Sequence, residues 1–134
     1  MIAELAIRDA VERLAGAWND EDRAGFSQLF AEDADYATGA GLRLSGRAHI
    51  NAHLSSSLGG SPPADKVHLI IDSVKLLTSA IALLHCSWQT VATRQPATGC
   101  AARAGVIAMV GRATRDGWEV LALHNTDRPG SIGT

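Results

Sequence analysis

The first candidates for proton transfer in this sequence are the imidazole of His124 and the phenol of Tyr36. An imidazole gains and loses a proton near pH 7, and a phenol hydroxyl donates a hydrogen bond to a carbonyl oxygen. If both face one cavity, His124 acts as the acid–base catalyst and Tyr36 as the hydrogen-bond donor. The structural alternatives are a hydrogen-bonded core histidine and a wall aromatic.

Further side chains are expected to contact a ligand in the same cavity. Bulky apolar groups make walls, and polar groups near them orient the ligand. An arginine is costly to bury alone, so Arg103 either meets an acidic ligand or lies at the open end. Plain packing is the alternative for each aromatic residue. The predicted ligand-binding residues are Trp18, Thr38, His53, Trp88, Arg103 and Met109.

Other motifs carry little chemistry. His49 and His53 have the i, i+4 spacing of a helical metal pair, but HINAH lacks the glutamate of a zincin and has no evident third ligand. Gly39 and Gly41 belong to a turn, since no GxGxxG precedes a helix. Neither cysteine has the cationic surroundings of a nucleophile. We therefore expect no metal and no cofactor.

Composition indicates one soluble domain spanning residues 1–134. The chain is 46% hydrophobic and 19% charged, with a formal net charge of −2. These values give no electrostatic basis for binding nucleic acid or an anionic membrane. No apolar run approaches the roughly 20 residues of a membrane span, and the N-terminus does not resemble a signal peptide. A cytoplasmic protein is expected.

The hydrophobic pattern changes from a helical period to a period of two along the chain. Residues 3–18 and 22–30 are predicted helices, followed by a strand at 35–38, a turn, a strand at 42–44 and a helix at 47–57 with Ser45 as its N-cap. Residues 66–77, 81–95, 100–115 and 118–127 are predicted strands. This order predicts an α+β domain with its helices on one face of a curved antiparallel sheet.

The Asp116–Gly117 hairpin signal gives a predicted register for the last two strands. As a two-residue turn it pairs Met109 with His124. One face then carries Arg103, Ile107, Met109, Ala122 and His124. The other carries Ala102, Ala104, Ala108, Val110, Leu121 and Leu123, which suits sheet-to-sheet packing in a homodimer. Trp88 and Cys86 join the His124 face if the preceding turn is centred between residues 97 and 98, and a one-residue slip would move them to the other.

The motifs AWN-x2-D-x3-F-x2-LFAEDADY, SGRAHI and DGW-x5-HNT resemble the SgcJ/EcaC-type branch of the SnoaL-like proteins. These belong to the superfamily of ketosteroid isomerase, scytalone dehydratase, limonene epoxide hydrolase and nuclear transport factor. The resemblance covers nearly the whole chain. It implies a cone-shaped, cystatin-like sheet with three N-terminal helices enclosing a pocket, and a homodimer through the outer sheet face. The fold alone does not select a reaction.

The superfamily's catalytic groups do not carry over to this chain. Thr38 falls where the isomerase has its proton-abstracting aspartate, Leu14 where it has its tyrosine, and Met109 where it has its second acid. Without a base and an acid, no dienolate forms. The paired carboxylates of an epoxide hydrolase are also missing. Tyr36, His124 and Asn125 are of the types that scytalone dehydratase uses, but they do not match it position by position.

Two functions remain open. The first is a cofactor-free acid–base enzyme acting on an apolar, polyketide-like carbonyl compound, with His124 and Tyr36 in the catalytic roles. The second is a non-catalytic dimeric module that holds a ligand or a partner. A proton-transfer rate that depends on His124 would favour the first, and a ligand recovered unchanged would favour the second.

Overall fold

The computed structural model describes residues 4–39, 41–59, 66–91 and 103–128. The elements follow the predicted order of two helices, two strands, a helix and four strands. They are α1 (Glu4–Asn19), α2 (Arg23–Gln28), β1 (Phe30–Ala37), β2 (Arg43–Ser45), α3 (Arg47–Gly59), β3 (Lys66–Leu76), β4 (Ile81–Val91), β5 (Ala104–Thr114) and β6 (Gly117–Asp127).

The first two helices form where the sequence carries helical signals. α1 buries Ile7, Val11 and Leu14, which recur on one face at helical spacing. Asp22 caps α2, because its carboxylate accepts a hydrogen bond of 3.0 Å from the backbone N–H of Gly25. None of the described helices is long and apolar enough to cross a membrane.

The third helix begins after Gly46, and its predicted N-cap takes another role. Ser45 belongs to β2, and its hydroxyl donates to the carboxylate of Asp35 at 3.0 Å. The prediction of Ser45 as N-cap is therefore wrong, although the predicted helix is present.

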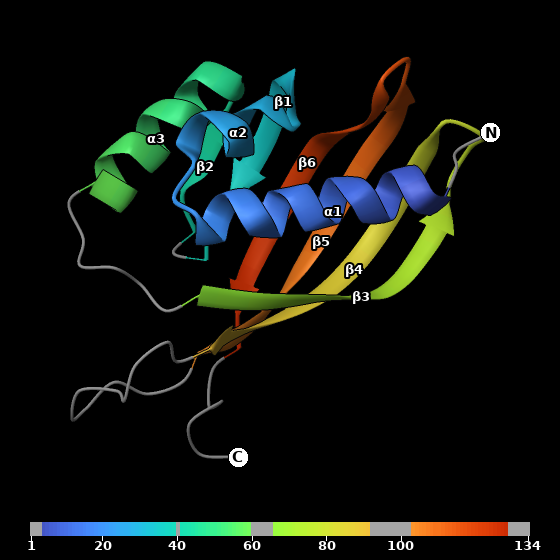
Figure 1. The fold of residues 1–134 in the computed structure, drawn as a ribbon. Coiled ribbons are helices and arrows are strands. Elements are labelled where there is room, and N and C mark those ends of the chain that lie inside the picture. The colour runs from blue at the N-terminus through green and yellow to red at the C-terminus, as the bar shows by residue number, and fades with distance from the viewer. Residues whose placement is uncertain (1–3, 40, 60–65, 92–102, 129–134) are drawn as a thin grey trace.

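The six strands form one sheet in the order β2-β1-β6-β5-β4-β3. All neighbouring pairs are antiparallel except β1 and β6, which run parallel, so the prediction of a fully antiparallel sheet needs this one correction. The three helices lie on the same side of the sheet (Figure 1). We call that side the inner face and the opposite side the outer face.

The predicted register between β5 and β6 is wrong by two residues next to the turn and by one residue beyond a bulge. The turn residues are Arg115 and Asp116, so Thr114 pairs with Gly117, and a bulge then shifts the pairing between Val110 and Gly111. The position of the turn and the bulge both depend on local backbone geometry. Together they displace β6 beyond the bulge by one position from the predicted register. Because side chains alternate between faces, this displacement exchanges the two faces of β6 beyond the bulge.

The register between β4 and β5 differs from prediction by two residues, which leaves the faces unchanged. A turn centred between residues 97 and 98 would pair Cys86 with Met109, whereas Cys86 pairs with Ile107 and Trp88 with Gly105. Trp88 and Cys86 therefore share the inner face with Met109, as in one of the two predicted registers. Cys86 is a buried free thiol whose pKa is raised to about 11 by burial and by the nearby Asp72 carboxylate.

Side chains fill the space between the helices and the inner face. Phe26 lies 5.4 Å from Phe30 and 6.3 Å from Tyr36 between ring centroids, and Trp18 lies 5.6 Å from Phe26. Such tilted pairs at 4.5–7 Å are favourable aromatic contacts. The core thus contains an aromatic cluster contributed by α1, α2 and β1.

Candidate functional site

The structure places His124 on the outer face, away from the helices. It pairs with Ala108 of β5 and Ala37 of β1 and is exposed, whereas its neighbour Leu123 is 1% exposed in the core. The predicted inward orientation of His124 is therefore wrong, and the predicted outward position of Leu123 is wrong with it. The one-residue displacement of β6 is the cause of both errors.

Tyr36 lies on the inner face in a row with Leu123, Met109 and Leu84. Its side chain is 9% exposed, and burial raises its pKa to about 12. The phenol therefore stays protonated throughout the physiological pH range and acts as a hydrogen-bond donor rather than a base. None of the described residues forms a hydrogen bond with the Tyr36 hydroxyl. This oxygen is also not among the described side-chain atoms that are fully buried without a hydrogen bond. It thus remains within reach of solvent.

A cluster of polar and aromatic side chains lies on the inner face where β4 and β6 end. We call Trp88, Arg103, Asn125 and Asp127 the rim cluster. The indole N–H of Trp88 donates to the amide oxygen of Asn125 at 2.7 Å. The Arg103 guanidinium forms an ion pair with Asp127 and lies 5.8 Å from the Trp88 ring centroid. The cluster is accessible, since the Arg103 and Asp127 side chains are 64% and 41% exposed.

Hydrogen bonding fixes which atoms of the rim cluster remain unused. An indole N–H is only a donor, so the bond from Trp88 requires the amide oxygen of Asn125 on that side and directs the Nδ2 group elsewhere. One oxygen of Asp127 meets Arg103, while Oδ1 is enclosed without a partner. The cluster therefore combines an oriented amide donor with a carboxylate that is half satisfied.

Two glycines, which have no side chain, leave space for the side chains of the rim cluster. A Cβ on Gly105 would lie 2.5 Å from ring atoms of Trp88 and 2.5 Å from the backbone oxygen of Thr126. A Cβ on Gly39 would lie 2.5 Å from Asp127 Oδ1 and 3.1 Å from Asn125 Nδ2. Both backbones therefore approach the cluster more closely than any other residue would allow.

The remaining predicted ligand-binding residues are dispersed. Trp18 is half-buried near the end of α1, and Met109 is buried in the core at 1% exposure. Thr38 holds the turn after β1, since its hydroxyl accepts from the N–H of Leu42 at 3.1 Å. His53 is half-buried on α3. The structure thus brings Trp88 and Arg103 together and does not gather the full predicted set.

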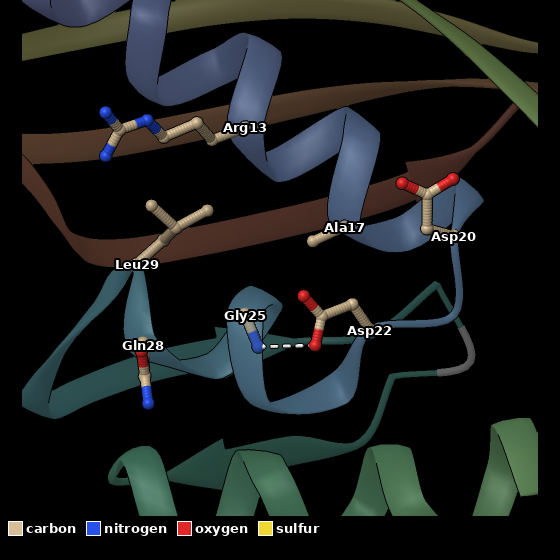
Figure 2. A pocket seen from close by; sticks show the side chains of 7 residues that line it. All are labelled: Arg13, Ala17, Asp20, Asp22, Gly25, Gln28 and Leu29. Atoms are coloured by element: carbon tan, nitrogen blue, oxygen red, sulfur yellow. Dashed lines mark hydrogen bonds between the residues drawn. The ribbon is translucent and has the colours of Figure 1, made fainter.

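A groove of about 390 Å³ lies between α1 and α2, apart from the rim cluster. Figure 2 shows Ala17 and Leu29 along it, with the Arg13 guanidinium at one end and Asp20 at the other. Its lining residues are Arg13, Ala17, Asp20, Asp22, Gly25, Gln28 and Leu29. None of the predicted site residues lines this groove. It is therefore a separate surface feature and not the predicted interior pocket.

Sequence reasoning missed Asn125 and Asp127. Alternation from an inward His124 places Asn125 on the wrong face, and Asp127 reads as the end of a strand. A signal does exist, because the indole N–H of a buried tryptophan usually has a hydrogen-bond partner, and Asn125, directly after His124, is a polar residue near the end of the last predicted strand. Within the described ranges, no three or more histidine, cysteine or acidic side chains gather as a metal site.

The architecture is a cystatin-like α+β fold, and solved structures share it. One is a domain of unknown function with a cystatin-like fold from Nostoc punctiforme, with 27% sequence identity, a TM-score of 0.80 and coverage of 93% of this chain and 76% of that one. Another is a ketosteroid isomerase-like protein from Erwinia carotovora atroseptica, with 16% identity, a TM-score of 0.75 and coverage of 92% and 94%. An NTF-2-like protein of unknown function from Shewanella oneidensis has 17% identity, a TM-score of 0.74 and coverage of 91% and 97%.

The family of the chain follows from its sequence match. The SnoaL-like domain family matches residues 1–124, so the chain belongs to the SnoaL-like family. No protein with curated annotation matches the chain.

Proposed function

We propose that this chain is a small-molecule-binding protein whose ligand, an apolar carbonyl compound, docks at the rim cluster beside Tyr36. The observation that carries the proposal is the Tyr36 hydroxyl, which belongs to a nine-tenths buried side chain yet has no partner among the described residues. Because this hydroxyl remains within reach of solvent, its O–H is available to a molecule that enters from there. A ligand carbonyl would supply the acceptor.

The chemistry of the rim cluster favours a planar ligand with acceptor atoms. Tyr36 and the Nδ2 group of Asn125 are both donors, and Trp88 contributes an aromatic wall beside Asn125. Trp18, which contacts Phe26 of the same aromatic cluster, extends the apolar surroundings. Arg103 at the exposed edge would meet an acidic substituent. In a proton-transfer reaction, Tyr36 would polarise the carbonyl through its hydroxyl.

The test uses 6-propionyl-2-(dimethylamino)naphthalene, a planar ketone whose fluorescence reports hydrogen bonding to its carbonyl. We expect the native chain to bind it and Tyr36→Phe to bind it about 3–10 times more weakly, which is the range of one net hydrogen bond. His124→Ala, on the other face, should bind it like the native chain. Equal affinity of the native chain and Tyr36→Phe would refute the proposed site.

We also propose that two copies pack through their outer faces, so that the chain acts as a dimeric binding module. No described helix covers this face (Figure 1), and it carries Ala108, Val110 and the exposed Val106, at 40%. Apolar exposure of this kind, on a face of small side chains, favours association with a second sheet.

The dimer is tested by light scattering coupled to size exclusion. Val106→Arg should convert the dimer to a monomer, because it introduces an unpaired charge at the proposed contact. Leu5→Arg is the matched control, since Leu5 is 80% exposed on α1, on the helix side of the sheet. A native chain that is monomeric at all concentrations would refute the dimer without affecting the ligand proposal.

A further inference from the structure

Two histidines lie in register on the outer face, one on each side of Ala108. His85 of β4 pairs with Ala108 of β5, and Ala108 pairs with His124 of β6. Directly paired residues share a face, and both histidines are exposed, while their strand neighbours Leu84 and Leu123 are buried. The sheet therefore holds two imidazoles in one row with only a methyl group between them.

The spacing of this row suits a shared metal ion. Neighbouring strands are 4.7–4.9 Å apart, so the Cα atoms of the two histidines are roughly 9.5 Å apart. Two imidazoles that lean over Ala108 can bring their ring nitrogens to about 2.0–2.1 Å from one ion. The small side chain of Ala108 leaves the space above it open to that ion.

We propose that His85 and His124 together bind one divalent late transition-metal ion, of the class of Zn²⁺, Ni²⁺ and Cu²⁺. These ions prefer imidazole nitrogen over the carboxylate oxygen that Mg²⁺ and Ca²⁺ favour. With two protein ligands, water completes the coordination, so the ion exchanges readily. The site uses no residue of the rim cluster and is independent of the proposed ligand.

The first test is isothermal titration of the tag-free chain with ZnCl₂ and with NiCl₂ at pH 7.5. We expect one ion per chain, or one per pair of chains if two copies share the outer face. His85→Ala and His124→Ala should each weaken binding by at least about tenfold, since even changes behind the ligands cost 10–100-fold in metal affinity. His68→Ala is the matched control, because His68 is exposed on the same face but pairs with Gln89, in a different row.

The second test addresses the geometry while keeping both histidines. Ala108→Leu should block the space between the imidazoles and weaken binding by a similar factor, whereas Ala108→Ser should not. Metal binding that survives both histidine substitutions, or no binding at millimolar metal, would overturn the proposal.

Discussion

Replacing Gly105 by alanine tests how the rim cluster is held. The new Cβ would lie 2.5 Å from Trp88 Cε2 and Cζ2, so the ring must retreat by about 1 Å to reach ordinary van der Waals contact. That movement would stretch the 2.7 Å bond from the indole to Asn125 beyond hydrogen-bonding distance. The backbone oxygen of Thr126, also 2.5 Å from the new Cβ, has less freedom to move.

The expected cost follows from these two effects. Overpacking costs about 1–3 kcal/mol, and losing one net hydrogen bond costs about 1 kcal/mol. We therefore expect Gly105→Ala to lower the free energy of unfolding by about 2–4 kcal/mol, or Tm by about 10 °C for a domain of this size. Differential scanning calorimetry measures this change, and the indole N–H signal of Trp88 in an NMR spectrum reports the broken bond.

Gly16→Ala is the matched control. Gly16 lies inside α1, and a Cβ there would meet nothing within 4 Å. Alanine should stabilise this helix by about 0.5–1 kcal/mol through its greater helix propensity. If Gly105→Ala melted at the native temperature with the Trp88 signal unmoved, the close contact of Gly105 with the ring would be refuted.

Three further predictions concern single side chains. Tyr36 is the chain's only tyrosine, so ultraviolet titration should show its ionisation near pH 12 in the folded protein, and the free energy of unfolding should fall as the pH rises from about 10 toward 12. In Asn19→Ala, two hydrogen bonds to the backbone of Val67 (3.0 and 2.8 Å) are lost, which should cost about 1–3 kcal/mol in urea unfolding. In a Cys100→Ser background, Cys86 should resist iodoacetamide at pH 8 until the chain unfolds, because its thiol is buried and has a raised pKa.

The element order was predictable because it rests on local signals. The spacing of Ile7, Val11 and Leu14 specifies a helix whatever the rest of the chain does, and Asp22 caps the next helix from within its own turn. The period of two after residue 66 likewise predicts strands without reference to their partners. Each of these signals acts over a few residues, so sequence alone carries it.

The orientation of β6 was not predictable in the same way. Its hairpin loop begins one residue before the Asp–Gly pair, and its bulge follows from backbone geometry rather than from side-chain alternation. The hydrophobic pattern does not distinguish the two possible registers of β6, because Leu121 and Ala122 are apolar residues, as Val120 and Leu123 are. A displacement by one position therefore puts Asn125 on the inner face in place of His124. The candidate site consequently contains an amide rather than an imidazole.

The rim cluster shows why polar residue types alone did not locate the site. β5 carries two glycines that each face a tryptophan ring, Gly105 beneath Trp88 and Gly111 beneath Trp118. At Gly111 a Cβ would lie 2.2 Å from the ring, and the Trp118 N–H remains enclosed without a partner. At Gly105, by contrast, the indole N–H of Trp88 donates a hydrogen bond to Asn125. A glycine makes space for each of the two indole rings in the same way. The two places differ in the hydrogen bonding of the indole N–H, and this difference separates plain packing at Trp118 from a candidate site at Trp88.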